Sequence, residues 1–443
     1  MTDEASAVLE LDDIQSGVLR PRPAPYAAVF ILLRIDEPRA GRDLMGRLGG
    51  VVATAAHPTS PAGDAWVSVA LSYHGLVALG VPQRSLESFA WELRQGMAAR
   101  AKVLGDTGES SPDRWEHPLG TKDVHVVITA LAPDVARVEA ALSRARGAYQ
   151  ARSGIEEIWR QDCHSLSTGK EPFGFQDGIS QPTIEGSGIP GTNPHEAPLK
   201  AGELVLGYPD EMGGLPPMPW PEVLGRNGTY VVFRKLHQRV AALRQYLKEN
   251  VSSPAEEEYL AAKMMGRWRS GAPLALCPVH DDPELGYDPH RNNDFLYGED
   301  PIGYKTPPGA HIRRANPRDA AIAGVARLHR LFRRRTVYGP ELPDGVLEDD
   351  GADRGVMFAV LGAHLGRQFE FVQSEWINGG ESLGLGDLRD PIVGTRDGTG
   401  SFSIPQRPIP RLLRGLPRFV ITRGGEYCFM PGLRALRWLA ELS

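Results

Sequence analysis

The sequence predicts an α+β protein in which helices pack on a sheet, because strand-like and helix-like segments alternate along its 443 residues. Residues 26–35 are apolar and β-prone, which is typical of a buried central strand. Pro133 and Asp134 precede a helix through Tyr149, in which apolar residues recur at three- and four-residue spacing. The same rhythm returns in the second half of the chain, which favours two similar α+β units.

The remaining elements follow from the same periodicities. The first half is expected to contain a short helix at 43–48, a strand at 65–71, a helix at 73–79, a longer helix at 85–99 and a strand at 125–131. The second half is expected to contain strands at 203–208, 229–235 and 356–361, and helices at 238–249, 253–272 and 366–376. Near the end, a hairpin is expected from 418–422 and 426–430, followed by a tail helix at 433–442.

A domain boundary is predicted near residue 190, because proline, glycine and asparagine are frequent between residues 184 and 199. The two predicted domains are therefore residues 1–190 and residues 191–443. A chain of this length can bury a large core and exceeds one usual domain.

The composition is that of an ordinary globular protein, with 41% hydrophobic and 23% charged residues. The net charge of −6 argues against broad electrostatic binding to nucleic acid. Residues 333–335 form a local run of three arginines, and we expect two of them to lie at a solvated helix end. Cys163, Cys277 and Cys428 are far apart and have no metal-ligand spacing, which indicates buried thiols in a reducing compartment.

The start of the chain, residues 1–5, is acidic and lacks the basic and apolar regions of a secretory signal. The longest apolar runs, such as residues 27–33, are too short to span a membrane. These features predict a soluble, cytoplasmic protein with no membrane partner. The sequence leaves the oligomeric state open.

A histidine in residues 309–318, which read GAHIRRANPR, is a candidate metal ligand. Prolines before and after this stretch predict a loop rather than a helix interior. A neutral imidazole such as that of His311 on a stiff loop is suited to be an axial ligand of haem iron. Arg313, Arg314 and Arg318 would then face carboxylates such as the haem propionates. The alternative is a solvated or hydrogen-bonded histidine in a basic loop.

Several other blocks accompany this histidine. Residues 171–182 read EPFGFQDGISQP and residues 331–341 read LFRRRTVYGPE, with GVMF at 355–358, QFEFVQ at 368–373 and RDPIVG at 389–394. In this order and spacing, which span about residues 170–395, the blocks resemble the dye-decolorizing peroxidase family. The resemblance implies two ferredoxin-like α+β halves, each an antiparallel sheet with packed helices, with haem b held in the C-terminal half.

The resemblance assigns roles on the proximal side of the haem. His311 matches the iron ligand of the family. Asp390 matches the carboxylate that accepts the other ring N–H, which makes the imidazole more electron-donating. Without the resemblance, Asp390 would be interpreted as a turn residue before Pro391. Arg318 is expected to contact a propionate or the haem edge.

On the distal side, Asp177 matches the acid/base that moves a proton between the two peroxide oxygens. Its neighbours Phe173, Phe175 and Gly178 predict an apolar pocket that raises the pKa of Asp177. The alternative is an Asp-Gly turn. Arg333 matches the distal arginine by its distance to Tyr338-Gly339-Pro340, although the adjacent arginines leave a one-residue shift open.

Position 335 departs from the family, which usually has a small or amide residue there, so the polarity of the distal side is open. Val356 and Phe358 are expected to line the distal pocket together, because residues i and i+2 of a strand share a face. Tyr338 and Trp376 match surface positions at which the family is thought to oxidise bulky dyes. Simple packing is an equally good interpretation of either aromatic residue.

The resemblance implies a haem-dependent peroxidase that reduces hydrogen peroxide and oxidises dyes, phenols or other organic donors. One alternative is a haem-handling protein with little turnover, and another is an α+β protein that binds no haem. The physiological reductant, manganese oxidation and packing into a larger shell are left open by the sequence.

Overall fold

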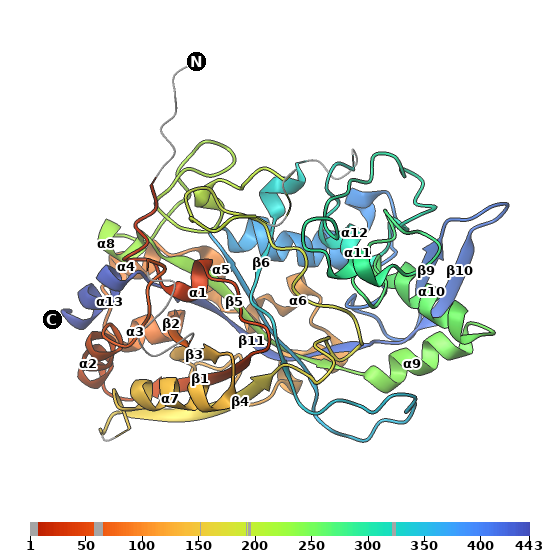
Figure 1. The fold of residues 1–443 in the computed structure, drawn as a ribbon. Helices are drawn as coiled ribbons and strands as arrows, with labels where there is room; N and C mark the ends of the chain where they lie inside the picture. Colours follow the sequence, from red (N-terminus) through yellow and green to blue (C-terminus); the bar gives the residue numbers. More distant parts are fainter. Residues whose placement is uncertain (1–7, 57–64, 151, 192, 194–195, 321–324) are drawn as a thin grey trace, which may run out of the picture.

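The computed structural model describes residues 8–56, 65–150, 152–191, 193, 196–320 and 325–443. Within them, one nine-stranded antiparallel sheet runs through the molecule in the order β4-β1-β3-β2-β11-β5-β8-β6, with β7 paired to β8 (Figure 1). The acidic start of the chain, on which the sequence analysis drew, lies outside the described residues.

The first half of the sheet is built from β1 (Ala27–Ile35), β2 (Trp66–Ser72), β3 (Val126–Ala132) and β4 (Ile155–His164). These strands lie in the order β4-β1-β3-β2. Helices α2 (Pro38–Leu48) and α7 (Val135–Arg146) pack on one face of this half. Residues of β1 alternate between two cores, because Val29 and Ile31 face these helices while Ala28 and Phe30 face the other side.

The second half of the sheet is built from β5 (Thr229–Gln238), β6 (Phe332–Arg333), β7 (Thr336–Tyr338), β8 (Gly355–Gly362) and β11 (Val420–Met430). The strands of this half lie in the order β11-β5-β8, followed by β6 and β7, which both pair with β8. If β6 and β7 are counted together as the second strand of this half, its fourth, first, third and second strands lie side by side, as β4, β1, β3 and β2 do in the first half. The predicted α+β fold with two ferredoxin-like halves is therefore confirmed.

The two halves join in one sheet where β2 pairs with β11, through Ser72 opposite Cys428 and Leu71 opposite Phe429. Helix α13 (Leu433–Ala440), at the end of the chain, packs against α2 of the first half. Because sheet and core are continuous, the boundary between residues 190 and 191 stays a prediction.

A third core lies on the far side of the second half, where α9 (Val240–Glu249), α10 (Pro254–Met265) and the hairpin of β9 (Gly400–Ile404) and β10 (Arg411–Leu416) pack together (Figure 1, right). Phe173 and Phe175 insert into this core and anchor the loop that carries Asp177. The remaining α-helices are α1 (Ser16–Leu19), α3 (Tyr73–Ala78), α4 (Gln83–Glu87), α5 (Trp91–Gln95), α6 (Ala101–Leu104), α8 (Glu222–Gly225), α11 (Pro283–Tyr287) and α12 (His311–Ala315).

Several predicted elements are wrong or have different bounds. The long helix at 85–99 is divided into α4, α5 and a short 3-10 helix, and the strand at 203–208 is absent from that described segment. Helix α10 ends at Met265, because Gly266 adopts a φ of 94°. Residues 365–370 and 372–377 form two π-helical segments where one helix was expected at 366–376.

The predicted hairpin at 418–430 is also wrong, since β11 runs without a turn from Val420 to Met430. Its pairing with β5 shifts between Thr422 and Gly424, which is a β-bulge rather than a reversal. Gly424 has a φ of 148° and lies against the side chain of Leu119, where a Cβ would clash. The consecutive glycines 424 and 425 therefore mark a β-bulge, where the segment that carries Leu119 approaches the strand closely.

No helix in the described part of the chain is long and apolar enough to cross a lipid bilayer. The three cysteines are unpaired; Cys163 and Cys428 are buried, as predicted, and Cys277 is only half-buried.

The junction between the two halves makes a direct prediction about stability. Phe429 is 0% exposed and contacts the rings of Phe89 and Tyr230, at centroid distances of 5.1 and 5.9 Å. We expect Phe429→Ala to lower the free energy of unfolding by about 3–5 kcal/mol, because it leaves a cavity between the halves. Urea unfolding followed by circular dichroism measures this change. Ile409→Ala, at a side chain that is 72% exposed, is the control and should change it by less than about 0.5 kcal/mol. Equal effects of the two substitutions would contradict the junction as a stability centre.

Candidate active site

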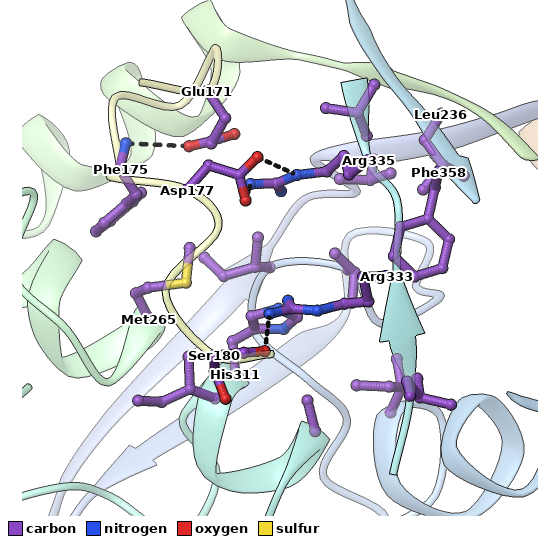
Figure 2. Close-up of a pocket in the computed structure, with 18 of the residues that line it drawn as sticks. Glu171, Phe175, Asp177, Ser180, Leu236, Met265, His311, Arg333, Arg335 and Phe358 are labelled. Atoms are coloured by element: carbon purple, nitrogen blue, oxygen red, sulfur yellow. Dashed lines mark hydrogen bonds and ion pairs between the residues drawn. The ribbon is translucent and has the colours of Figure 1, made fainter. Parts of the chain in front are cut away.

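A cavity of about 230 Å³ lies in the second half of the molecule. It is bounded by the loop that carries Asp177, by α12 and by one face of β8 (Figure 2). Its apolar walls include Leu236, Met265, Leu331, Val356, Phe358, Phe369, Ile377 and Ile392. Into this mainly apolar space the chain directs one histidine and several charged side chains, which is the usual composition of a ligand pocket.

His311 is the first residue of the short helix α12, so the predicted loop is in part a helix of one and a half turns. The prolines still limit it, since Pro307-Pro308 precede the helix and Pro317 follows its end. The ring lines the cavity, and its Nδ1 lies 2.9 Å from Oδ2 of Asp390. This contact holds the ring with Nε2 on the cavity side.

Asp390 is fully buried and uses both carboxylate oxygens. Oδ2 faces His311, and Oδ1 accepts hydrogen bonds of 2.8 Å from the backbone N–H groups of Ile392 and Val393. Burial raises the pKa of Asp390, but His311, the Val393 N–H and Arg314 together lower it below its ordinary value. The two interpretations of Asp390 are therefore compatible, because the residue makes a turn and also orients the histidine.

Asp177 lies across the cavity, on a loop in which Gly178 adopts a φ of 82°. Its side chain is 12% exposed. Arg335 lies 2.5 Å from Oδ1 and 3.2 Å from Oδ2, and Arg22 lies 3.3 Å from Oδ2. Figure 2 shows Asp177 and Arg335 facing each other on one side of the cavity, with His311 on the other side of Arg333 in this view.

The predicted rise in the pKa of Asp177 is wrong. Burial does raise this pKa, but Arg335, Arg22 and Arg333 outweigh burial and hold the pKa well below its ordinary value. Phe173 and Phe175 belong to the third core and also line the cavity, but they do not keep the three arginines away from the carboxyl. Asp177 is therefore an ionised carboxylate among cations.

The three consecutive arginines are divided between the two sides of their strand. Arg333 and Arg335 line the cavity, whereas Arg334 points away and donates to the backbone carbonyls of Gly17 and Val18. Arg333 donates to the carbonyl of Ser180 at 3.0 Å, and burial lowers its pKa to about 10. None of the three lies at a solvated helix end, which corrects that expectation; the run begins with Arg333 at the end of β6 and stops just before β7.

Val356 and Phe358 both line the cavity from β8, in agreement with their alternation on the strand. Arg318 also lines it, but its guanidinium donates to the carbonyls of Asn293 and Phe295 and to the Asn293 side chain. A propionate contact by Arg318 therefore stays a prediction.

Arg313 and Arg314 are not among the residues that line the cavity. Arg313 donates to the carbonyls of Asp300 and Thr306, and Arg314 donates to that of Trp376. These two arginines fix loops around α12 instead of facing an anionic ligand.

The predicted surface positions of two aromatic residues are wrong, because Tyr338 and Trp376 are each only 1% exposed. The hydroxyl of Tyr338 donates to Asp353, and Lys235 lies 4.9 Å from its ring. Trp376 packs edge-on against His329 and Phe371. Neither side chain meets solvent directly, so a bulky dye has no access to them; a redox role for either stays a prediction.

Two functional contacts were missed from the sequence. Arg22, which lies among prolines near the start of the chain, reaches Asp177 across 155 positions. Glu171 is buried and lines the same cavity as Asp177. Its carboxylate accepts hydrogen bonds from the Phe175 N–H and from the Gln238 side chain. The proline-rich context of Arg22 gave no signal, because long-range pairing has no local periodicity.

The residues of this cavity fit a haem. The free Nε2 of His311 is a nitrogen ligand of the type that haem iron takes, and apolar residues line the walls. Arg267, Arg318 and Arg330 also line this cavity. Their guanidinium groups are held by Asn292 and Asn293 (Arg267), by Asn293 and Phe295 (Arg318) and by Glu196 (Arg330), so a contact with the haem carboxylates stays a prediction. No cluster of acidic, histidine or cysteine side chains suited to another metal occurs in the described part of the chain.

Comparison with known proteins identifies relatives over nearly the whole chain. A peroxidase of Mycetinis scorodonius, peroxidase 2, is 30% identical over 98% of this chain and 88% of its own. The multifunctional dye peroxidase of an Amycolatopsis species is 30% identical over 99% of this chain and 97% of its own. A search of family models gives no match.

Solved structures agree with this relationship. An ancestral D-type dye-decolorizing peroxidase superposes with a TM-score of 0.84 at 29% identity, covering 97% of this chain and 99% of that one. A dye-decolorizing peroxidase in complex with 2,6-dimethoxyphenol gives a TM-score of 0.86 at 26% identity, covering 98% and 100%. From these full-length similarities and the arrangement of its cavity, this chain belongs to the dye-decolorizing peroxidase family.

Proposed function

We propose that this protein is a haem b peroxidase that reduces hydrogen peroxide and oxidises phenols, dyes or other organic donors. The observation that supports this most strongly is the pairing of His311 with the fully buried Asp390 across one cavity from Asp177 and Arg333. The relatives point the same way, since one solved neighbour is a complex with a phenol.

Bound haem supplies the iron at which peroxide is reduced. His311 would hold that group through Nε2, and Asp390 would accept the Nδ1–H so that the ring keeps one tautomer and one orientation. The backbone N–H groups of Ile392 and Val393 fix Asp390 in turn. The proximal side is thus held by hydrogen bonds that involve both oxygens of one carboxylate.

On the distal side, Asp177 takes the proton from the O–H of hydrogen peroxide and returns it to the other oxygen, which leaves as water. Arg333 stabilises the negative charge that develops as the O–O bond lengthens. Its guanidinium is buried at the cavity wall, where a charge acts more strongly than in water. Val356 and Phe358 keep this side apolar and narrow.

A phenol is the class of reductant that the comparisons support, since one related peroxidase was solved in complex with 2,6-dimethoxyphenol. We also propose a cytoplasmic location, which the unpaired cysteines support. The haem-handling alternative has the same proximal side, so only the use of Asp177 distinguishes it from the peroxidase.

His311→Ala is expected to abolish the specific binding of haem, because it removes the nitrogen ligand and leaves Asp390 without its partner. The absorption spectrum and the haem content per protein of the purified variant measure this loss. His290→Ala, at an exposed position outside the cavity, is the control and should keep the wild-type spectrum. A haem band that His311→Ala leaves unchanged would refute the ligand assignment.

Asp177→Asn is expected to slow the reaction with hydrogen peroxide by about 10²–10⁴-fold, because an amide cannot accept the proton. Stopped-flow absorption gives the rate, and the haem content should stay at the wild-type level. Asp397→Asn is a matched control, since Asp397-Gly398 is another Asp-Gly pair, and it lies exposed outside the cavity. A nearly wild-type rate in Asp177→Asn would favour the haem-handling alternative.

A further inference from the structure

The segment from the end of β6 to the start of β7 presents two arginines to the cavity, Arg333 and Arg335. Alternation along this extended segment places Arg333 and Arg335 on the same side and Arg334 on the other. Arg333 is the residue that the family resemblance and the proposed function use. Arg335 has no part in the proposed function, although its guanidinium contacts Asp177 directly.

Arg335 grips Asp177 with two nitrogens. Its terminal nitrogen lies 2.5 Å from Oδ1 and its Nε lies 3.2 Å from Oδ2, which is a two-point contact with one carboxylate. Arg22 adds a contact of 3.3 Å to Oδ2, and the N–H of Gly178 donates to Oδ1 at 2.6 Å. Both oxygens of Asp177 are therefore occupied.

Other parts of the chain hold Arg22 and Arg335 in place around Asp177. Arg22 donates to the backbone carbonyl of Arg335 at 2.6 Å and lies 4.0 Å above the ring of Tyr26. The hydroxyl of Tyr26 accepts from the backbone N–H of Val337 at 2.7 Å. These contacts hold the N-terminal segment against β7, so Asp177 is gripped from two distant parts of the chain.

The charged groups around Asp177 leave it with an excess of positive neighbours. Arg22, Arg333 and Arg335 face it, whereas the carboxylate of Glu171 is occupied by the Phe175 N–H and by Gln238. Tyr26 is the other titratable group nearby, and burial raises its pKa above the ordinary value. No described carboxylate competes with Asp177 for the hydrogen bonds of the Arg335 side chain.

We propose that Arg335 is a positioning residue of the distal site, which keeps Asp177 ionised and fixes the direction of its two oxygens. The proposal rests on the proposed function, in which Asp177 receives the proton of hydrogen peroxide. In that step the O–H bond breaks, the carboxylate becomes a carboxylic acid and a hydroperoxide anion remains. Arg335 keeps the Asp177 carboxylate unprotonated in acid solution, so that it can still accept a proton. Protonation of Asp177 then weakens its ion pair with Arg335.

The first experiment measures the protonation of Asp177 directly in the haem-loaded protein. The infrared absorption of protonated carboxyl groups is recorded against pH, and the signal of Asp177 is the difference between each protein and its Asp177→Asn counterpart. In the wild type we expect no protonated signal down to about pH 3, below the ordinary carboxyl range. In Arg335→Leu we expect the midpoint to rise by about 1–3 pH units, because one opposite charge in direct contact is lost.

Three further variants separate position from charge. Arg335→Lys keeps the charge but loses the two-point contact, so its midpoint should lie between those of the wild type and Arg335→Leu. Arg22→Leu should shift the midpoint in the same direction but less, because Arg22 makes one longer contact. Arg334→Leu is the matched control, since it removes a neighbouring arginine that points away from the cavity, and its midpoint should equal that of the wild type.

The pH profile of the peroxide reaction gives the second readout. Because only ionised Asp177 accepts a proton, the acid limb of the rate should move to higher pH in Arg335→Leu, in step with the infrared midpoint. An unchanged infrared midpoint in a folded Arg335→Leu variant would overturn the proposal. If Arg335→Leu does not fold, Arg335→Lys and Arg22→Leu decide by the same criterion.

A failure of the proposed function would be seen in the peroxide rate and not in the infrared midpoints. A near-normal peroxide rate in Asp177→Asn would remove the acid/base role, whatever the infrared midpoints show. An infrared shift in Arg335→Leu without a matching shift of the acid limb would overturn the link between Arg335 and catalysis.

Discussion

The cost of burying charge is the constraint on which this active site depends. An ionised group inside a protein is tolerated only when a partner or a set of hydrogen bonds replaces the lost water. Asp390 is buried completely and is compensated by His311 and two backbone N–H groups. Arg314 is equally buried and is compensated by backbone carbonyls. These pairings fix α12 and the loop after Asp390 in one arrangement, and therefore fix the direction of the His311 ring.

The sheet supplies the frame in which these pairings occur. Strand β8 forms one wall of the cavity, and its pairing with β6 and β7 fixes the position of the arginine run beside it. Arg333 in turn holds the carbonyl of Ser180, which ties the Asp177 loop to β6. The distal carboxylate, the distal cations and the apolar wall are thus placed by one set of strands, while the proximal histidine comes from a helix outside the sheet.

The sequence predicted the strands and helices with strong periodicity, and it missed those formed by long-range contacts. Strand β1 was recognised because it is apolar on both faces, whereas β4 was missed because it is a half-exposed edge strand rich in charges. The glycines at 424 and 425 looked like a turn, but they form a bulge, in which Leu119 from the other half lies against Gly424 and Met97 lies against Gly425.

The site was predictable to the extent that its residues form local motifs. His311, Asp177, Arg333 and Asp390 were proposed through the family resemblance, and the structure brings all but Asp390 to the surface of one cavity, with Asp390 behind His311. The pKa of Asp177 was predicted in the wrong direction, because its sequence neighbours are aromatic while its spatial neighbours are arginines. Arg22 carries no local signal at all, since only folding places it beside residue 177.

The two carboxylates of the site differ in a way that follows from their partners. Asp390 contacts the Nδ1 of one imidazole and two backbone N–H groups, so its partners fix its orientation and that of the histidine ring. Asp177 faces two guanidinium groups in contact and a third nearby, so its charge is already balanced before any substrate arrives. A proton that reaches Asp177 therefore weakens an established set of ion pairs, which Asp390 does not have to the same extent. The two carboxylates thus differ because cations surround one of them, and a ring nitrogen with two backbone N–H groups surrounds the other.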